Sequence, residues 1–525
     1  MKIIRVITYL FLLGISTINA QKKKNIKPNI ILIYADDLGR GMLGNYGQKY
    51  LTTPNIDKLA DKGMRFNNVY GCQFCAPARA SLISGMHDAH MQPWSLTKAG
   101  IYVKEAKEIN LEEIYKKIDK VSKPAKENEI FLGTVAQKQG YTTAEFGKLE
   151  WGFATTAQRV KSHGWDYHFG YYDHVRCHGF FPPFLFENGK LVEIPGNTRI
   201  DCGKTFESES PENYKERWDM TGKVKYSEDI FIEKMLGFID ENNPKKTDRP
   251  FFIYYPTQLP HGPISVPAVD PELKNNPNLT EFEKEYGTMV KLLDESVGKI
   301  YHHLDKLGIL DNTIIVFTGD NGHEVYTKQE GKTENTRSIL GGGKFDNITT
   351  KYYSDINGDI FDGNDGMAGL KRDNWEGGVR VPMYWYWKDK IKGGTESNQL
   401  IANYDILNTI SELIGGKNYD EKDSKSYAKT LLGGKSEEHE YTVYASNLGP
   451  AIVTKEGWKL RYQKTTKIFQ LYFLPDDYRE EKVLNDKYPK KVKKLTALLI
   501  KECDGDLENG SHAVFVRPEV KNKKK

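Results

Sequence analysis

Residues 75–85 read CAPARASLISG, and this stretch constrains the chain more than any other. Pro77 stands where a helix can begin, because proline fixes φ and lacks only an N–H that the first turn leaves unpaired. The residues after it can continue the helix, and Gly85 is placed to end it. Cys75 lies at the helix N-terminus, where free N–H groups favour an anion, and Arg79 follows one turn later on the same face. The pattern predicts an anion-handling site built around a modifiable thiol.

The same stretch resembles a family signature. Cys-x-Pro-x-Arg followed by Ala-Ser-Leu-Ile-Ser-Gly is similar to the motif of the type I sulfatases, in the alkaline-phosphatase superfamily. In that family the cysteine is oxidised after translation to formylglycine (3-oxoalanine), whose hydrated aldehyde is the nucleophile. Two other interpretations stay open for the stretch alone. Cys75 can be an ordinary buried cysteine with Arg79 in a surface ion pair, or Cys72 and Cys75 can form a redox pair.

The first twenty residues have the pattern of a secretory signal peptide. Lys2 and Arg5 precede an apolar run over residues 7–15, and Ala20 supplies the small residue after which we expect cleavage. The run is too short to span a membrane, and no later stretch approaches that length. No cysteine follows the cut, so we expect no lipid anchor. The mature protein is expected to be exported, periplasmic or secreted, without a membrane span.

Length, net charge and cysteine count limit the kinds of protein that this chain can form. A length of 525 residues suggests one large domain and a smaller one, and a net charge of +4 is too balanced for a general nucleic-acid binder. Five cysteines are an odd number for an exported protein, so at least one is unpaired or has another role. Cys177 and Cys202 are the pair we would expect to be bridged, although sequence cannot give connectivity. The basic end of the chain is most simply a solvated tail.

Three apolar runs each end in polar residues. They are Asn29–Ala35 before Asp36-Asp37, Pro250–Tyr255 before Pro260-His261-Gly262-Pro263, and Thr313–Thr318 before Gly319-Asp320-Asn321-Gly322. Runs without alternation are typical of strands buried on both faces of a parallel sheet. A helical pattern over Glu281–Leu307 separates two of them, which indicates an α/β sandwich. Ligands bind beyond the carboxyl ends of such strands, so the polar residues are predicted to share one edge.

The acidic residues at these strand ends suggest a metal. The candidate ligands are Asp36, Asp37, Asp320 and Asn321. Their oxygens suit Ca²⁺ or Mg²⁺ better than zinc. Adjacent residues on a straight strand point to opposite faces, so Asp36 and Asp37 can share an ion only if the chain bends, which Gly39 makes easier. The alternative is that each acidic pair caps a helix or turn. The sulfatase resemblance implies a Ca²⁺ site formed by these residues together with Cys75.

Further matches to the family assign the other site residues. By this resemblance Lys148 and Lys371 hold sulfate oxygens, and His261 faces the leaving group. Glu150 stands where the family usually has histidine, so it either takes over that role or turns away. We expect it, with His174, to contact substrate. The alternative for a lone lysine is a solvated charge, and for a lone histidine a hydrogen-bonded loop residue.

The C-terminal part has a different sequence pattern from the α/β region before it. Short strands are predicted over Tyr441–Ser446, Ala451–Thr454, Trp458–Tyr462 and Ile468–Leu474, and helices over Ala402–Ile414 and Glu480–Glu502. This resembles the family's small antiparallel subdomain. The predicted fold is a large mixed, mostly parallel sheet sandwiched by helices, with that subdomain attached. We expect a signal peptide over 1–20, a catalytic domain over 26–440, the subdomain over 441–515 and a basic tail over 516–525.

Residues 355–365 begin like a calcium loop but lack its glycine and final glutamate, which favours a polar loop at the active-site mouth.

These features predict a sulfuric ester hydrolase. The nucleophile would be the formylglycine made from Cys75 by a formylglycine-generating or radical maturation enzyme, with Arg79 among the groups that stabilise the sulfate. The favoured substrate is a sulfated polysaccharide or its oligosaccharides, of algal ulvan or carrageenan type, followed by glycosaminoglycan and then a small aryl sulfate. Two alternatives stay open: a phosphodiester or phosphonate hydrolase of the same superfamily, and a non-catalytic sulfated-glycan binder.

Overall fold

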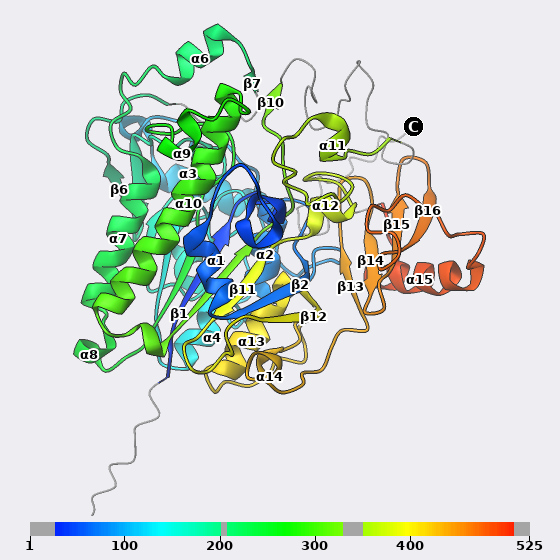
Figure 1. Cartoon of the computed structure of the whole chain (residues 1–525). Helices are drawn as coiled ribbons and strands as arrows, with labels where there is room; N and C mark the ends of the chain where they lie inside the picture. Colours follow the sequence, from blue (N-terminus) through cyan, green and yellow to red (C-terminus); the bar gives the residue numbers. More distant parts are fainter. Residues whose placement is uncertain (1–26, 201–206, 329–349, 509–525) are drawn as a thin grey trace, which may run out of the picture.

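The computed structural model describes residues 27–200, 207–328 and 350–508, and its main element is a ten-stranded sheet (Figure 1). The strand order is β12-β2-β11-β9-β1-β8-β3-β4-β5-β6. The strands are β1 (Asn29–Ala35), β2 (Met64–Tyr70), β3 (Thr142–Gly147), β4 (Tyr167–Gly170), β5 (Phe184–Glu187), β6 (Lys190–Glu193), β8 (Phe251–Pro256), β9 (Thr313–Gly319), β11 (Met383–Tyr386) and β12 (Thr395–Ala402). The central strands β9, β1, β8, β3 and β4 run parallel, and β11, β5 and β6 are antiparallel to their neighbours. The predicted mixed, mostly parallel sheet is confirmed.

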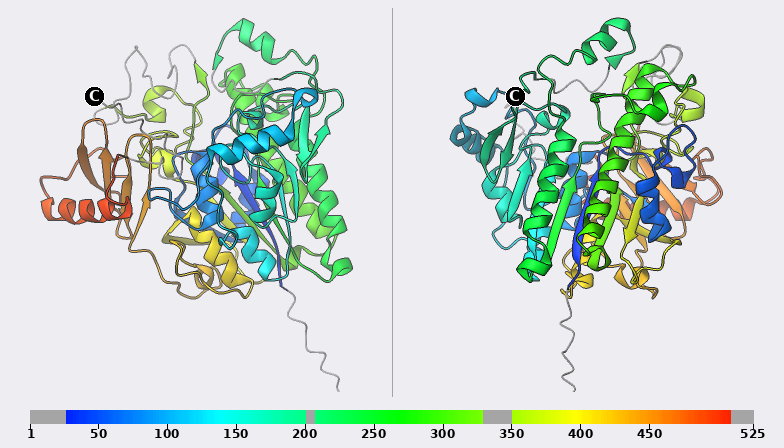
Figure 2. Two further views of the ribbon diagram at one scale, coloured as in Figure 1. Left: turned by 180° about the vertical axis from the view of Figure 1, so that it is seen from behind. Right: turned by 60° about the vertical axis from the view of Figure 1, so that its left-hand side comes forward.

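The strand β1 lies at the centre of the sheet and is buried on both faces. Ile31 and Ile33 pack into one core layer, whereas Ile30 and Leu32 pack into the other, as the two-residue period of a strand requires. The first layer is covered by α1 (Pro54–Asp61), α7 (Ser227–Glu241) and α10 (Glu281–Lys306), and the second by α2 (Cys75–Ser84), α3 (Leu111–Val121), α4 (Leu132–Lys138) and α13 (Ile406–Leu413) (Figure 2). The sheet is therefore sandwiched by helices, as predicted.

The register of the three central strands brings their carboxyl ends to one level. Ala35 at the end of β1 lies opposite Gly319 of β9, and Tyr34 lies opposite Pro256 of β8. The polar residues that follow each strand therefore start from the same edge of the sheet. The sequence-based expectation of a shared edge is confirmed.

The C-terminal part forms a separate four-stranded antiparallel sheet with one helix, drawn in orange and red in Figure 1. It contains β13 (Tyr441–Tyr444), β14 (Ala451–Thr454), β15 (Trp458–Gln463), β16 (Ile468–Phe473) and α15 (Pro489–Glu502). Two predicted helices begin later than expected. The helix predicted from 480 starts only at Pro489, because Glu480 has a left-handed φ of 55° and proline favours a first helical turn. The helix predicted from 402 starts at Ile406, because Ala402 still belongs to β12.

The remaining elements are short. They are α5 (Ala157–Ser162), α6 (Pro211–Arg217), α8 (Pro244–Thr247), α9 (Pro271–Lys274), α11 (Ser354–Asn357), α12 (Glu376–Val379), α14 (Ala428–Leu431) and the pair β7 (Glu207–Ser208) and β10 (Thr327–Lys328).

The predicted signal peptide and basic tail lie outside the described residues, and the domain limits stay predictions. Cys177 has a free thiol, whereas its expected partner Cys202 lies outside the described residues. Within the described ranges no helix has the length and apolar character that crossing a membrane requires.

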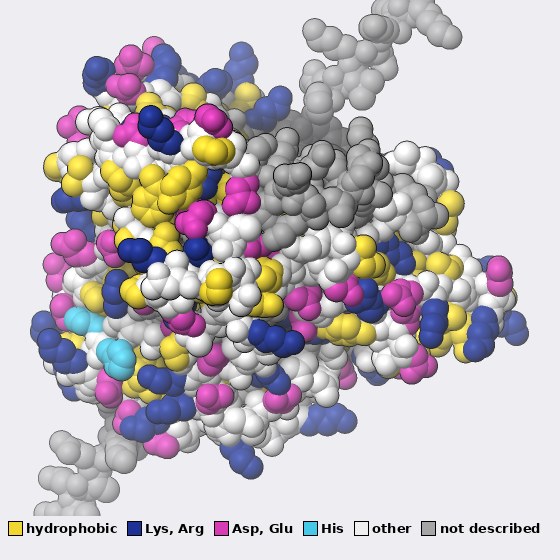
Figure 3. Space-filling view, turned by 45° about the horizontal axis from the view of Figure 1, so that its top comes forward, with side chains coloured by type: hydrophobic (Ala, Val, Ile, Leu, Met, Phe, Trp, Pro, Cys, Tyr) yellow, Lys and Arg dark blue, Asp and Glu magenta, His cyan; other side chains and the backbone are white. Residues whose placement is uncertain are grey.

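The surface carries charges of both signs. Figure 3 shows basic and acidic side chains interspersed over one face of the molecule, in keeping with the net charge of +4.

A buried ionic network joins the small antiparallel sheet to the rest of the molecule. Lys459 of β15 is fully buried, and its Nζ lies 3.0 Å from Glu376 Oε1 and 2.7 Å from Glu480 Oε1. Glu376 begins α12 and also accepts a hydrogen bond from Arg380 Nη1 at 2.9 Å. Burial raises the pKa of Glu376, but Lys459 and Arg380 outweigh it and lower that pKa to about 2. The network therefore keeps this carboxylate ionised inside the protein.

We predict that Lys459→Met destabilises the protein strongly. The change leaves Glu376 and Glu480 without their shared cation, and breaking a buried ion pair costs about 3–5 kcal/mol. Urea unfolding followed by tryptophan fluorescence measures the loss. Lys455→Met is the matched control, since Lys455 lies at the surface and its ion-pair partner Glu440 is exposed. Equal effects of the two substitutions would contradict this role of Lys459.

Candidate active site

The helix α2 places Cys75 at the edge of the sheet. It begins at Cys75, two residues earlier than Pro77 suggested, and ends before Gly85, whose φ is 70°. The thiol is 2% exposed, and Arg79 one turn later is fully buried. Cys72 and Cys75 both carry free thiols, so the structure contains no bridge between them. The surface ion pair considered for Arg79 is wrong, because its guanidinium lies among buried acids.

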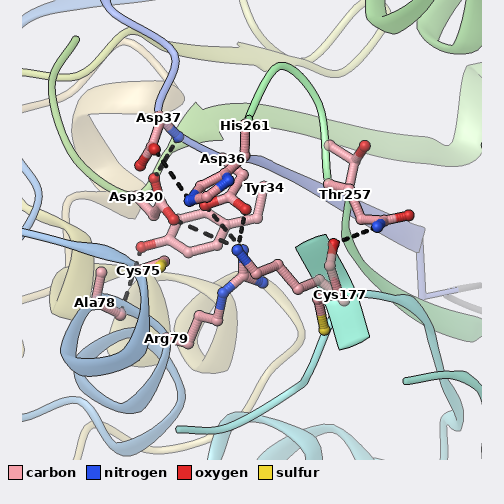
Figure 4. A network of polar contacts seen from close by, with 12 residues as sticks. Tyr34, Asp36, Asp37, Cys75, Ala78, Arg79, Cys177, Thr257, His261 and Asp320 are labelled. Carbon is pink, nitrogen blue, oxygen red and sulfur yellow. Dashed lines mark hydrogen bonds and ion pairs between the residues drawn. The ribbon is translucent and has the colours of Figure 1, made fainter. Parts of the chain in front are cut away.

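The acidic residues after β1 and β9 form one cluster (Figure 4). The bend required between Asp36 and Asp37 is present, because Asp37 has a left-handed φ of 61°. The Asp37 N–H donates to Asp320 Oδ1 at 3.0 Å, and Asn321 Nδ2 donates to Asp37 Oδ1 at 2.8 Å. One oxygen from each of the three aspartates lies within 4.8 Å of the others. Two strand ends thus hold three carboxylates at one point.

Several oxygens of this cluster have no hydrogen-bond partner among the residues that the structure describes. Asp36 Oδ1, Asp320 Oδ2 and Asn321 Oδ1 are all buried and unsatisfied. Burial and the negative charges of Asp36 and Asp37 raise the pKa of Asp320 well above its ordinary value. Unpaired buried oxygens of this hard type are the ligands of Ca²⁺ or Mg²⁺. The residues present therefore fit a divalent cation.

Three cations surround the acidic cluster. Arg79 Nη2 lies 3.7 Å from Asp36 Oδ1 and 3.6 Å from Asp320 Oδ2. Lys148 Nζ contacts Asp36 Oδ2, and Lys371 Nζ donates to Asp37 Oδ2 at 2.6 Å. All three cations are at least 98% buried, since the exposed fraction of Lys371 is 2% and the others are at 0%. Each positive charge thus faces a buried aspartate.

Histidines complete the surroundings of Cys75. His174 Nε2 lies 3.3 Å from Cys75 Sγ, and His261 Nε2 lies 3.1 Å from Lys371 Nζ. His178 stacks on His261, with ring centroids 4.2 Å apart. Burial, together with the charges of the nearby lysines, lowers the pKa of all three histidines well below its ordinary value. In the free protein these imidazoles are therefore neutral near pH 7.

These residues border a cavity of about 280 Å³. It is lined by Phe74, Cys75, Phe153, His174, His178, His261, Tyr326, Lys371, Arg372 and Asn447. The structure therefore brings together the predicted Cys75, His174, His261 and Lys371, with Arg79 and Lys148 buried behind them. Sequence reasoning missed His178, although its place four residues after His174 was a usable signal. It also missed Tyr326, whose hydroxyl donates to Asp37 Oδ2.

Glu150 lies elsewhere. Its carboxylate oxygens are both 3.1 Å from His163 Nδ1, and Oε1 accepts a hydrogen bond from Thr155 at 3.3 Å. The side chain is fully buried and is not part of the cavity lining. The expected contact of Glu150 with substrate is therefore not supported, because its carboxylate turns away to a histidine partner. This placement favours a structural role in the segment after Lys148.

Comparisons with known proteins agree on one family. The family model described as Sulfatase matches residues 28–416. The chain is 28% identical over 413 residues to an N-acetylgalactosamine-6-sulfatase of Rattus norvegicus, covering 78% of this chain and 66% of the rat protein, slightly less than two thirds. It is 26% identical to an N-acetylgalactosamine-6-O-sulfatase of Bacteroides thetaiotaomicron, covering 90% of this chain and 92% of that protein.

Solved structures show the same fold. The structure of Ps i-CgsB in complex with k-i-k-neocarrahexaose has a TM-score of 0.65 at 23% identity and covers 92% of this chain and 94% of that one. A structure from work on glycosaminoglycan metabolism by Bacteroides thetaiotaomicron has a TM-score of 0.65 at 25% identity, covering 91% of this chain and all of the other (100%).

The environment of Cys75 predicts an unreactive thiol. Burial raises its pKa to about 11, and the opposing effect of Lys148 and Lys371 is smaller. The thiolate is the reactive form, so alkylation of unmodified Cys75 by iodoacetamide should be slow at pH 7 and rise about tenfold per pH unit up to pH 9. Tandem mass spectrometry of the peptide over residues 66–79 locates the adduct on Cys75 or on Cys72, which lies on the same peptide, and so gives the rate for Cys75 alone. A rate that does not change between pH 7 and pH 9 would show that the thiol is already ionised.

Proposed function

Because the chain belongs to the sulfatase family, we propose that it is a sulfuric ester hydrolase that removes sulfate from a sulfated carbohydrate. The observation that carries this proposal is the cluster of a helix-terminal cysteine, three buried cations and three buried carboxylates, of which Cys75 and Lys371 line one cavity. A sulfate ester is an anion, and it needs a cationic, preorganised site for its charge to be stabilised during hydrolysis.

We assign the nucleophile to Cys75 after its conversion to formylglycine by a maturation enzyme. The unmodified thiol is buried and has a raised pKa, so it is a poor nucleophile at neutral pH. The modified residue would supply the hydroxyl of a hydrated aldehyde. His174, whose Nε2 lies 3.3 Å from Cys75 Sγ, is placed to accept a proton from a group bound to that residue.

Asp36, Asp37, Asp320 and Asn321 would hold the divalent cation, and Ca²⁺ is our choice because the donors are all oxygens. When bound, it would supply positive charge and lower the pKa of the attacking hydroxyl. The strand ends already fix these side chains by hydrogen bonds between Asp37, Asp320 and Asn321. The protein's part is thus to hold the oxygens in place.

The cations and His261 act on the substrate. Arg79, Lys148 and Lys371 would stabilise the sulfate oxygens, and His261 would give a proton to the leaving alcohol. The pKa of His261 is lowered in the free protein by burial and by Lys371. A negative sulfate ester bound beside it opposes the charge of Lys371 and raises that pKa. We infer that binding of the substrate favours the protonated form of His261, which can then give its proton to the leaving alcohol.

The substrate is proposed to be a polysaccharide or one of its oligosaccharides. Phe74 and Phe153 at the cavity stack on each other at 6.2 Å and provide an apolar wall against which a sugar face can pack. An algal polysaccharide of ulvan or carrageenan type is our first choice, and the neocarrahexaose ligand of one structural relative supports the carrageenan type. A glycosaminoglycan is supported by another relative, whose structure comes from work on glycosaminoglycan metabolism. Export through a signal peptide over residues 1–20 is proposed with this role, since such polymers are extracellular.

We predict sulfate release from at least one member of a panel of defined sulfated oligosaccharides. Ion chromatography measures free sulfate, and Cys75→Ala should reduce its release to the rate without enzyme. Cys503→Ala is the matched control, because it removes a buried thiol of the small C-terminal sheet and helix. Release of phosphate from a phosphodiester without any sulfate release would favour the phosphodiesterase alternative. Tight glycan binding without hydrolysis by matured protein would favour the glycan-binding alternative.

We predict one Ca²⁺ per chain, lost in Asp320→Asn. Elemental analysis gives the metal content, and thermal unfolding in Ca²⁺ and in EDTA gives an independent readout. At free Ca²⁺ about 100 times its Kd, the wild type should gain about 2.7 kcal/mol of stability, and the variant should gain far less. Asp294→Asn, a buried carboxylate on α10 that binds Asn55, is the control. Stoichiometric zinc, or equal stabilisation of Asp320→Asn, would contradict the assignment.

A further inference from the structure

Arg372 is a cation at the cavity that the sulfate-binding set does not use. It lines the cavity beside Lys371, and its side chain is 35% exposed, whereas Arg79, Lys148 and Lys371 are buried. Those three cations face Asp36, Asp37 or Asp320. The ion-pair partner of Arg372 is instead Glu324, at 2.8 Å. Arg372 is thus positioned at the more open part of the same cavity.

The backbone at this position does not favour an arginine. Arg372 has a left-handed φ of 76°, which glycine adopts freely and which strains a residue with a β-carbon. The conformation is held by the Arg372 N–H, which donates to Gln73 O at 2.8 Å, two residues before Cys75. Since glycine would fit the backbone better, the side chain is the reason for having arginine there. Strained residues of this kind cluster at functional sites.

The guanidinium is anchored but not saturated. Nη1 donates to Glu324 Oε2, and in the described ranges no further side-chain hydrogen bond of Arg372 is present. A guanidinium has five N–H donors in a planar fork, so most of them are free for a ligand. Glu324 is 1% exposed and cannot itself extend into solvent, so it fixes the direction of the arginine. Such a fork matches the two oxygens of a carboxylate or a sulfate.

We propose that Arg372 binds a second anionic group of the substrate, a carboxylate or another sulfate carried beside the ester that is cleaved. This inference rests on the proposed function and narrows it: the substrate is a glycan with at least two negative charges close together. A singly sulfated sugar would leave the free donors of Arg372 without a partner. Charge-assisted hydrogen bonds of this kind correspond to a preference of about tenfold to hundredfold.

The test compares two oligosaccharides that carry the same cleavable sulfate and differ only in the second anionic group. One has a uronate carboxylate or a second sulfate, and in the other that group is reduced or removed. The measured quantity is the ratio of kcat/KM for the two compounds. In the wild type this ratio should favour the doubly charged compound, and Arg372→Gly should lower it by about tenfold to hundredfold. Arg372→Lys, which keeps the charge but loses the fork, should give an intermediate ratio.

The control is Arg479→Gly, since Arg479 is similarly exposed at 32% and also has an acidic partner, Asp355, but does not line the cavity. It should leave the ratio unchanged. A wild-type ratio near one, or an equal loss for both compounds in Arg372→Gly, would overturn the proposal and leave Arg372 as a partner of Glu324 only.

A binding measurement separates this proposal from the proposed function. Calorimetry on Cys75→Ala, which is expected not to turn substrate over, gives the Kd for each of the two oligosaccharides. Absence of sulfate release by matured wild type would refute the hydrolase. A preference for the doubly charged compound that Arg372→Gly abolishes would still support Arg372 as its binding residue, and equal Kd values would refute that role.

Discussion

The site depends on three buried aspartates, which follow β1 and β9, and on the three buried cations that face them. Three aspartates face three cations, and the pairs are almost completely removed from water. A buried charge without a partner is costly, so each group constrains the position of the others. The pairing is nevertheless incomplete, because within the described part of the chain Asp36 Oδ1, Asp320 Oδ2 and Arg79 Nη2 have no hydrogen-bond partner. A divalent cation bound to the aspartates would pair with the free carboxylate oxygens, and a sulfate bound to the cations would accept a hydrogen bond from Arg79.

The fold produces this arrangement because neighbouring parallel strands end at the same level of the sheet. Parallel strands β8, β1 and β9 present residues after their carboxyl ends to one edge, and α2 begins at the same edge with Cys75. The bend at Asp37 turns a second carboxylate to the side of the first. The four-stranded antiparallel sheet also contributes to the cavity, because Asn447, in the turn between β13 and β14, is one of the lining residues. The chemistry therefore draws on segments from the whole length of the described chain.

Much of this arrangement could be predicted from sequence, because it follows from local pattern. The run before Asp36 has the composition of a buried strand, and the Pro77–Gly85 interval defines a helix with its end. Other features depend on the path of the chain in space. The partner of Glu150 is thirteen residues away in His163, and only the folded segment shows that this carboxylate points away from the cavity. The left-handed backbone of Arg372 likewise depends on a contact between distant parts of the chain, the hydrogen bond from its N–H to Gln73 O.

The central claim is that the helix-terminal residue 75 acts only after modification, within this set of compensating charges. The most direct measurement is the dependence of the sulfate-release rate on the fraction of Cys75 converted to formylglycine. Preparations made with different amounts of a maturation enzyme provide the series, and peptide mass spectrometry gives the fraction in each. The account predicts a straight line through the origin, with the same turnover per converted chain throughout. Activity that is independent of the converted fraction, or that persists when all of Cys75 is a thiol, would contradict it.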